Sequence, residues 1–304
     1  MVVQQLERRR SGRSRRFLAA PVGAGLACLV LATAGCSPGG AAADDAGGDP
    51  HQALQHAADE LVRAGTARAR TSMEMASGGT RVTIRGSGTY DFVRRVGELR
   101  VQLPQDPAGV EPQGPITEML APGALYMKNR GAGVPADKWV RIDTTTLSDG
   151  NLVTGGATDP LTAAELLRGA RSVEYAGPAE VEGVAVRHYR GVVDLARAAE
   201  LAPKENRAVL RAAVKGFTKD TVPFDAYLDD EGRLRKIRHE FSFANGQTEG
   251  GSSGGASGAP AGSGSRSGKA VAVMSTTWLD AFGTKAAAKL PESGDIYAGR
   301  IAQG

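Results

Sequence analysis

The sequence predicts an α+β fold built on an antiparallel β-sheet, and three observations point to this class. Stretches in which apolar and polar residues alternate recur from Met73 to Leu279. Several of the turns between them are short, and only three segments have the residue spacing of helices. Consecutive strands joined by short turns pair antiparallel, and the apolar face of such a sheet needs a cover, which the few helices supply.

The clearest strand is predicted over residues 81–92. A period of two marks a strand with one buried and one solvated face. The odd positions here are polar, and the even positions are Val82, Ile84, Gly86, Gly88, Tyr90 and Phe92. Residues 95–103 continue the sheet with Gly97, Leu99, Val101 and Leu103 on one side. Met73 and Met75 begin the same apolar series, and Leu125 and Met127 extend it.

Three glycines, Gly86, Gly88 and Gly97, fall on the predicted apolar face. Glycine lets a strand bend and leaves space beside it, so these positions fit a strongly curved sheet. The alternative is that they mark places where a helix packs tightly against the sheet.

Five later strands are predicted at residues 171–176, 184–193, 222–228, 234–243 and 269–279. The acidic stretch at residues 229–232 between two of them is typical of a hairpin turn.

Three helices are predicted. Residues 51–64 carry apolar side chains at helical spacing, and Gly65 can end this helix. A short helix follows Asp159-Pro160 and ends by Gly169, because proline suits the first helical position. Residues 194–217 form a longer helical region, which is broken or kinked near Pro203.

Residues 1–35 are predicted to be a signal peptide. Six arginines precede an apolar run from Phe17 to Ala34, which ends in small residues immediately before Cys36. The run is too short and too rich in glycine for a comfortable membrane span of roughly 30 Å. Ser14-Arg15-Arg16 also resembles a twin-arginine signal, so Sec and twin-arginine export both stay open.

Cys36 is the predicted lipid attachment site. The stretch Thr33-Ala34-Gly35-Cys36 resembles the bacterial lipobox, in which acyl chains such as palmitate are attached and the cysteine becomes the new N-terminus. Thr33 departs from that pattern, which usually has Leu or Val there, and the alternative is an ordinary signal peptide with an incidental cysteine. Cys28 would leave with the signal, so the mature chain would have no disulfide and no cysteine nucleophile.

The mature chain is predicted to be a single domain on a tether. Residues 36–50 are mostly Gly, Ala and Asp, which bury little and suit a flexible tether from the lipidated cysteine. Residues 51–304 form the domain, with a Gly/Ser/Ala insertion at residues 245–268 that we expect to be disordered.

The net charge of +4 belongs to the signal peptide. Of the 37 basic and 33 acidic residues, six arginines and one glutamate lie in residues 1–35, so the mature chain is near −1. This near-neutral balance gives no electrostatic case for a nucleic-acid partner.

Three stretches carry a resemblance to a known family. They are Tyr126-Met127-Lys128 with Lys138-Trp139-Val140-Arg141, residues 183–189 leading to Val193-Asp194, and residues 222–229 followed by Gly232-Arg233-Leu234. On these and on the order of elements, the chain resembles the LppX/LprG-like lipoproteins of actinobacterial envelopes, and more distantly the LolA/LolB lipoprotein carriers. The resemblance implies a strongly curved antiparallel half-barrel, helices on its concave face, and an apolar cavity between them for acyl chains. The Gly/Ser insertion departs from the family pattern.

No pattern in the sequence predicts catalysis, a metal site or a cofactor. The four histidines lack metal-ligand spacing, and His188 is better explained as a structural histidine. Residues 251–255 formally match G-x-S-x-G, but they lie in the Gly/Ser tract instead of a strand-to-helix turn. Asp229, Asp230 and Glu231 lack the alternation of an EF-hand loop.

We therefore expect a non-enzymatic lipoprotein on the extracytoplasmic face of the cell membrane, which binds or transfers an apolar envelope lipid or lipoglycan. An envelope transporter is a candidate partner. The alternative is an interaction or sensor domain with a filled core, and an envelope hydrolase ranks third. The expected cavity residues are Met73, Met75, Val82, Ile84, Gly86, Gly88, Leu99, Val101, Leu125, Met127, Phe224 and Leu228.

Overall fold

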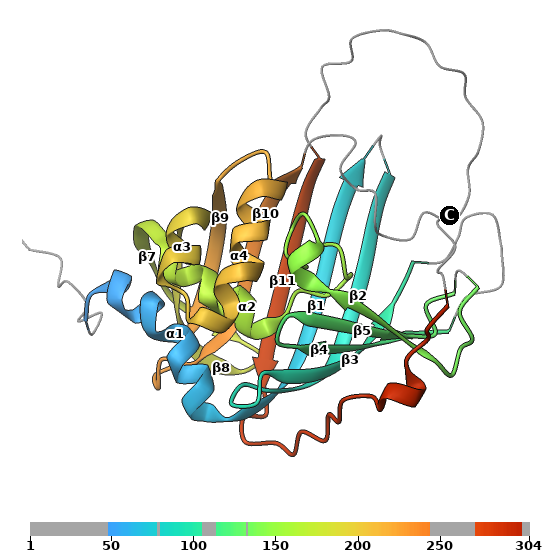
Figure 1. The fold of residues 1–304 in the computed structure, drawn as a ribbon. Coiled ribbons are helices and arrows are strands. Elements are labelled where there is room, and N and C mark those ends of the chain that lie inside the picture. Colours follow the sequence, from blue (N-terminus) through green and yellow to red (C-terminus); the bar gives the residue numbers. More distant parts are fainter. Residues whose placement is uncertain (1–47, 78–79, 105–113, 132, 244–270, 300–304) are drawn as a thin grey trace, which may run out of the picture. The chain divides into compact units, whose positions relative to one another are not determined.

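The computed structural model in Figure 1 describes residues 48–77, 80–104, 114–131, 133–243 and 271–299. The predicted signal peptide, Cys36, most of the predicted tether and the Gly/Ser insertion lie outside the described residues.

The described strands form one antiparallel sheet. Its eleven members lie in the order β6-β5-β4-β3-β2-β1-β11-β10-β9-β8-β7. Their bounds are β1 (Thr66–Ser77), β2 (Thr80–Asp91), β3 (Val96–Gln102), β4 (Ile116–Ala121), β5 (Ala124–Lys128), β6 (Trp139–Asp143), β7 (Ala170–Val181), β8 (Val184–Asp194), β9 (Thr221–Leu228), β10 (Leu234–Phe243) and β11 (Val271–Asp280). The edge strands β6 and β7 do not pair with each other, so the sheet is curved but open, as in a half-barrel.

The described helices lie on one side of this sheet (Figure 1). They are α1 (Pro50–Ala64), α2 (Pro160–Leu166), α3 (Leu195–Leu201) and α4 (Lys204–Gly216). We call the sheet face that they cover the inner face and the opposite one the outer face. The fold is thus the predicted α+β class, with helices packed over one face of a curved antiparallel sheet.

The helix ends follow from local chemistry. The Asp49 carboxylate accepts the His51 N–H at 2.9 Å at the start of α1, and Gly65 ends it with φ 81°. The Asp159 carboxylate caps α2 in the same way, by accepting the Thr162 N–H at 2.7 Å. The predicted break at Pro203 separates α3 from α4.

Two strands, β4 and β6, were not predicted as strands from the sequence. In β4 the apolar Met119 faces outward but is 2% exposed, because Ala288 of the C-terminal segment packs near it. A strand that is apolar on both faces loses the alternation by which strands are recognised. β6 has only five residues, and Ile296 of the C-terminal segment forms a bridge with its Trp139.

The glycines of the inner face make room for neighbouring strands and side chains. A Cβ on Gly97 would lie 2.3 Å from the Tyr90 ring, and a Cβ on Gly88 would lie 1.8 Å from the Glu98 carbonyl oxygen of β3. The nearest atoms to these two positions thus belong to neighbouring strands of the sheet. Close approach of β2 and β3 fits a strongly bent sheet.

Candidate functional site

The twelve expected cavity residues all come from strands of the inner face. Ten of them lie on β1, β2, β3 and β5, where Gly88, Leu99 and Met127 share one cross-strand row that also passes through β4. Phe224 and Leu228 lie on β9, and β10 and β11 separate them from this group. The sequence reading missed the contribution of β4, whose Glu118 lies in that same row between Leu99 and Met127.

An irregular stretch, residues 149–158, covers this part of the inner face; we call it the inner segment. A Cβ on Gly156 would lie 3.5 Å from Ile84, 3.6 Å from Val101 and 3.7 Å from Glu118 Oε1. A Cβ on Gly86 would lie 3.5 Å from that of Ala157. Ile84, Gly86 and Val101 therefore pack against the inner segment, and a ligand that reaches them has to displace it.

The inner segment is held mainly by its own hydrogen bonds. The Asp149 carboxylate accepts the backbone N–H groups of Asn151, Val153 and Thr154 at 3.0, 2.7 and 2.7 Å. The Thr158 hydroxyl donates to the Leu152 carbonyl oxygen and shares a hydrogen bond with the Ser275 hydroxyl of β11, both at 2.7 Å. The Asp149 bonds would survive a rigid movement of the segment, whereas the Thr158–Ser275 bond would break.

Three polar groups on the inner face of the sheet are buried with unpartnered atoms. Glu118 is 0% exposed, and neither of its carboxylate oxygens has a hydrogen-bond partner among the described residues. The same holds for the Thr71 hydroxyl and for His239 Nε2. Burial raises the pKa of Glu118 well above its ordinary 4.5, and it lowers the pKa of His239 to about 3, so the His239 imidazole is neutral near pH 7.

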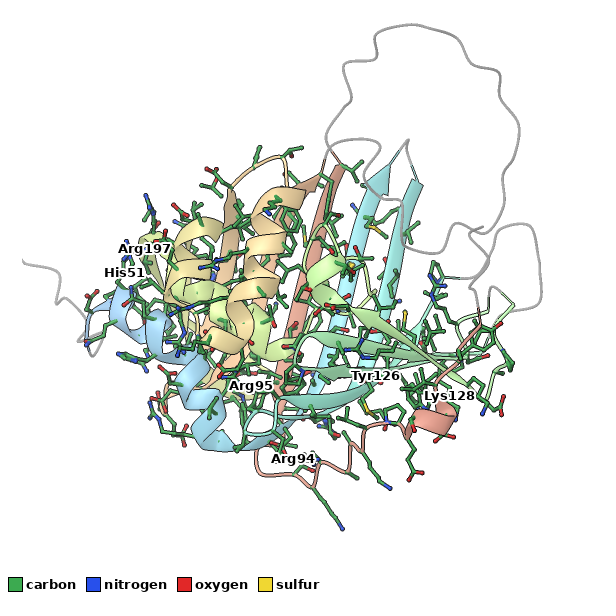
Figure 2. All side chains as sticks on the ribbon, in the orientation of Figure 1. His51, Arg94, Arg95, Tyr126, Lys128 and Arg197 are labelled. Atoms are coloured by element: carbon green, nitrogen blue, oxygen red, sulfur yellow. The ribbon has the colours of Figure 1, made fainter. Side chains whose placement is uncertain are left out.

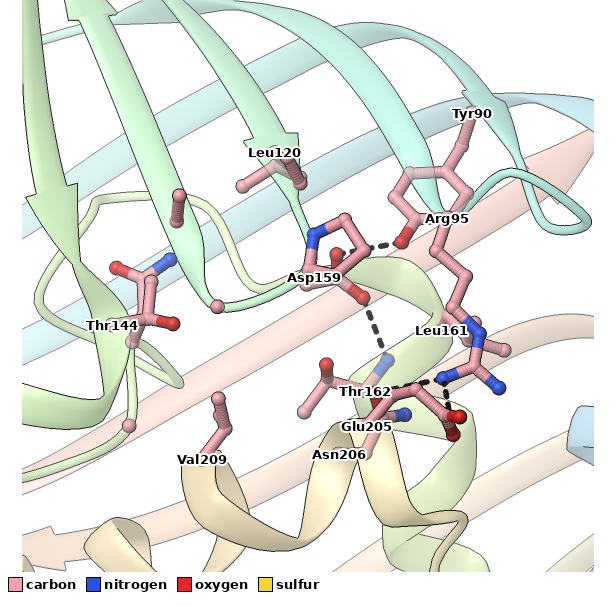
Figure 3. Close-up of a pocket in the computed structure, with 16 residues that line it drawn as sticks. Tyr90, Arg95, Leu120, Thr144, Asp159, Leu161, Thr162, Glu205, Asn206 and Val209 are labelled. Carbon is pink, nitrogen blue, oxygen red and sulfur yellow. Dashed lines mark hydrogen bonds and ion pairs between the residues drawn. The ribbon is translucent and has the colours of Figure 1, made fainter.

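A small polar pocket lies at one end of the inner face (Figure 3). The Tyr90 hydroxyl donates to Asp159 at 2.8 Å, and burial raises the pKa of both groups. Arg95, labelled in Figure 2, reaches Glu205 and Asn206 of α4 at 3.4 Å. The pocket measures about 40 Å³, which suits a group of the size of water and is too small for an acyl chain.

The apolar inner face becomes partly exposed at the end of β1 and β2 that lies away from this pocket. Met75, Val82 and Ile84 are only partly buried there, in contrast to the fully buried Leu99 and Leu125. Leu103 and Val271 are likewise partly buried next to the core. These side chains form an apolar rim from which the covered part of the inner face can be approached.

The remaining candidates from the sequence have structural partners. His188 hydrogen-bonds Asp225 at 2.9 Å and stacks on Tyr227 at 4.3 Å. Asp229 is buried at the predicted hairpin turn, where it pairs with Arg233. Within the described ranges, no three His, Cys, Asp or Glu side chains are grouped as metal ligands would be. The helices of these ranges are all too short or too polar to cross a membrane.

No family model and no curated protein matches the sequence. Among solved structures, the fold is similar to LprF from Mycobacterium bovis, with 10% identity over 80% of this chain and 96% of that one and a TM-score of 0.38. For lipoprotein LppX from Mycobacterium tuberculosis, the identity is 10% over 75% and 94% of the chains, with a TM-score of 0.39. A LolA superfamily protein from Nitrosomonas europaea has 9% identity over 82% and 99%, with a TM-score of 0.32.

LppX and the LolA superfamily, which the sequence resembles, are thus among the solved structures of similar fold. The TM-scores are below 0.5, so we take nothing about function from these likenesses. The functional case rests on the inner face and its cover.

Proposed function

We propose that the protein is a membrane-anchored envelope lipoprotein that binds an apolar lipid or lipoglycan on the inner face of its sheet and passes it on. The acyl chains on Cys36 hold it at the extracytoplasmic face of the cell membrane, and an envelope transporter is a candidate partner. One observation carries the proposal: the irregular inner segment covers the apolar inner face. The Thr158 hydroxyl holds this segment to Ser275 of β11 by one hydrogen bond.

The energetics of exchange between segment and ligand support this function. An acyl chain of about 15 methylenes gains roughly 12 kcal/mol on burial, at about 0.8 kcal/mol per methylene. Moving the inner segment exposes two large apolar side chains, Leu152 and Val153, at about 1.5–3 kcal/mol each. Ligand burial can therefore offset the cost of opening, and binding of this kind requires no catalytic residue.

The anchor leaves the domain within reach of the bilayer. About 13 residues separate Cys36 from the first turn of α1, which gives a maximum extension of roughly 45 Å. More than one acyl chain on the cysteine would make the attachment stable, because a single chain holds a protein only marginally.

A disulfide that fixes the inner segment to the sheet tests the proposal. Gly86→Cys with Ala157→Cys places two Cβ atoms 3.5 Å apart, which is within the range for a disulfide. A Cβ on Gly86 would also lie 2.5 Å from the Thr71 hydroxyl, so Thr71→Ala is added. The mature chain otherwise contains only Cys36, so mispairing is limited.

The readout is native mass spectrometry of the purified protein after incubation with fatty acids, with extraction of co-purified lipid in parallel. We expect the oxidised triple variant to take up no lipid. The same variant under reducing conditions is the control and should take up about one lipid per chain. Equal uptake by the two forms would rule out binding beneath the inner segment.

The second candidate function is an interaction or sensor domain with a filled core. It is favoured by the close packing of the inner face, where Leu99, Val101 and Leu125 are 0%, 0% and 1% exposed. A protein that carries no lipid from its host and takes up none when offered would belong to this class.

A further inference from the structure

Glu118 is an acidic residue in an apolar row. It lies in β4 between Leu99 of β3 and Met127 of β5, and the next inward positions of its own strand are Ile116 and Leu120. Its exposed fraction is 0%, and both carboxylate oxygens lack a hydrogen-bond partner among the described residues.

This arrangement costs stability in the closed protein. A buried polar group without a partner destabilises a fold, whereas Leu or Met at the same place would pack without that cost. Among the described side chains, no cation or other charged group perturbs this carboxyl, whose protonation is altered by burial alone. The structure thus supplies no internal role for the side chain, and a group that costs stability at a covered binding face points to a ligand.

The position of Glu118 along the face fits that role. The inner segment passes Glu118 at Gly156, Gly86 at Ala157, and Ser275 of β11 at Thr158. These three contacts run from the Glu118 side chain toward β11 within three consecutive residues, which span at most about 7 Å. A ligand that replaces the inner segment would therefore pass directly beside the Glu118 carboxyl.

We propose that Glu118 binds a hydroxyl group carried on the apolar chain of the ligand, so that the natural ligand is a hydroxylated acyl lipid. A carboxyl group accepts a hydrogen bond from a hydroxyl group in either protonation state, so such a pair gives a partner to a carboxyl that has none among the described residues. This inference rests on the proposed function, because the hydroxyl group reaches Glu118 only when the inner segment is displaced.

The test compares octadecanoic acid with a series of octadecanoic acids that carry one hydroxyl group at successive positions along the chain. Dissociation constants are measured for the mature protein by competition in native mass spectrometry. We expect at least one hydroxylated isomer to bind roughly tenfold more tightly than the plain acid, the size of one net hydrogen bond. Glu118→Met should abolish this preference and leave binding of the plain acid intact, whereas Glu118→Gln should retain much of it.

Met119→Leu, a change on the outward face of the same strand β4, is the matched control and should keep the preference. Binding of the plain acid without preference for any isomer would overturn the inference and leave the proposed function standing. A preference that persists in Glu118→Met would overturn it as well. Failure of every probe to bind would overturn the proposed function and this inference with it.

Discussion

Replacement of Glu118 by Met should stabilise the protein. The substitution removes a carboxyl that is 0% exposed and unpartnered among the described residues, and it replaces that group with an apolar side chain of similar length. Relief of an unsatisfied buried group is worth about 1–3 kcal/mol, so the free energy of unfolding should rise by that amount even at low pH, where the carboxyl is neutral in both states.

The gain should grow as the pH rises. Burial holds the pKa of Glu118 well above its ordinary 4.5, so the folded state keeps the proton that the unfolded state releases. Below pH 4.5 the carboxyl is protonated in both states and carries no ionisation penalty, and this penalty grows as the pH rises from 4.5 toward the folded pKa. The slope is about 1.4 kcal/mol per pH unit, and the advantage of Glu118→Met over the native protein should widen at that rate above pH 4.5.

The assay is urea unfolding followed by circular dichroism at pH values from 4 to 8, for the native protein, Glu118→Met and Glu118→Gln. The Gln variant does not titrate but keeps a polar group, so it isolates the pH-dependent part. Differences in unfolding free energy that do not change with pH, or a Met variant less stable than the native protein, would refute the burial of an unpartnered carboxyl.

Two further predictions use the same unfolding assay. The low pKa of His239, about 3, means that its contribution is complete above pH 6.5 and falls by about 1.4 kcal/mol per pH unit as the pH drops toward 3. His239→Gln should therefore flatten the acid limb of the stability curve, and an unchanged limb would contradict the burial of a neutral imidazole. Arg168→Leu should cost about 3–5 kcal/mol, because it leaves the Glu165 carboxylate, 2% exposed, without its partner and also removes the 2.6 Å pair with Asp59. Arg168→Leu combined with Glu165→Leu should recover most of this loss, and a double variant as unstable as the single one would show that the charge pair is not the cause.

The sequence was most informative where local chemistry decides the structure. Gly65 marks the end of α1, and the alternation from Val82 onward marks β2, because a left-handed glycine and a half-buried strand act over a few residues. The helix break at Pro203 is equally local, since proline lacks the N–H that a helix interior needs.

The candidate site was only partly predictable. Glu118 has the same strand face as its apolar neighbours two residues away, Ile116 and Leu120, which indicates its inward direction once the strand is known. From the sequence alone, a single glutamate in a short apolar stretch is normally interpreted as a solvent-exposed residue. The cover over the inner face was not predictable, because residues 149–158 have neither a helix nor a strand period. Their placement depends on Gly150 and Gly156 with positive φ and on contacts with distant strands.

The position of β11 in the sheet has a consequence for how the chain folds. This strand is the last of the described strands, yet it lies between β1 and β10 and joins the first six strands to the remaining four. Without Val271–Asp280 the sheet would fall into two parts, each with a long unpaired edge, at β1 and at β10. Unpaired edges attract other chains, so we expect the protein to be most prone to aggregation before this strand has paired.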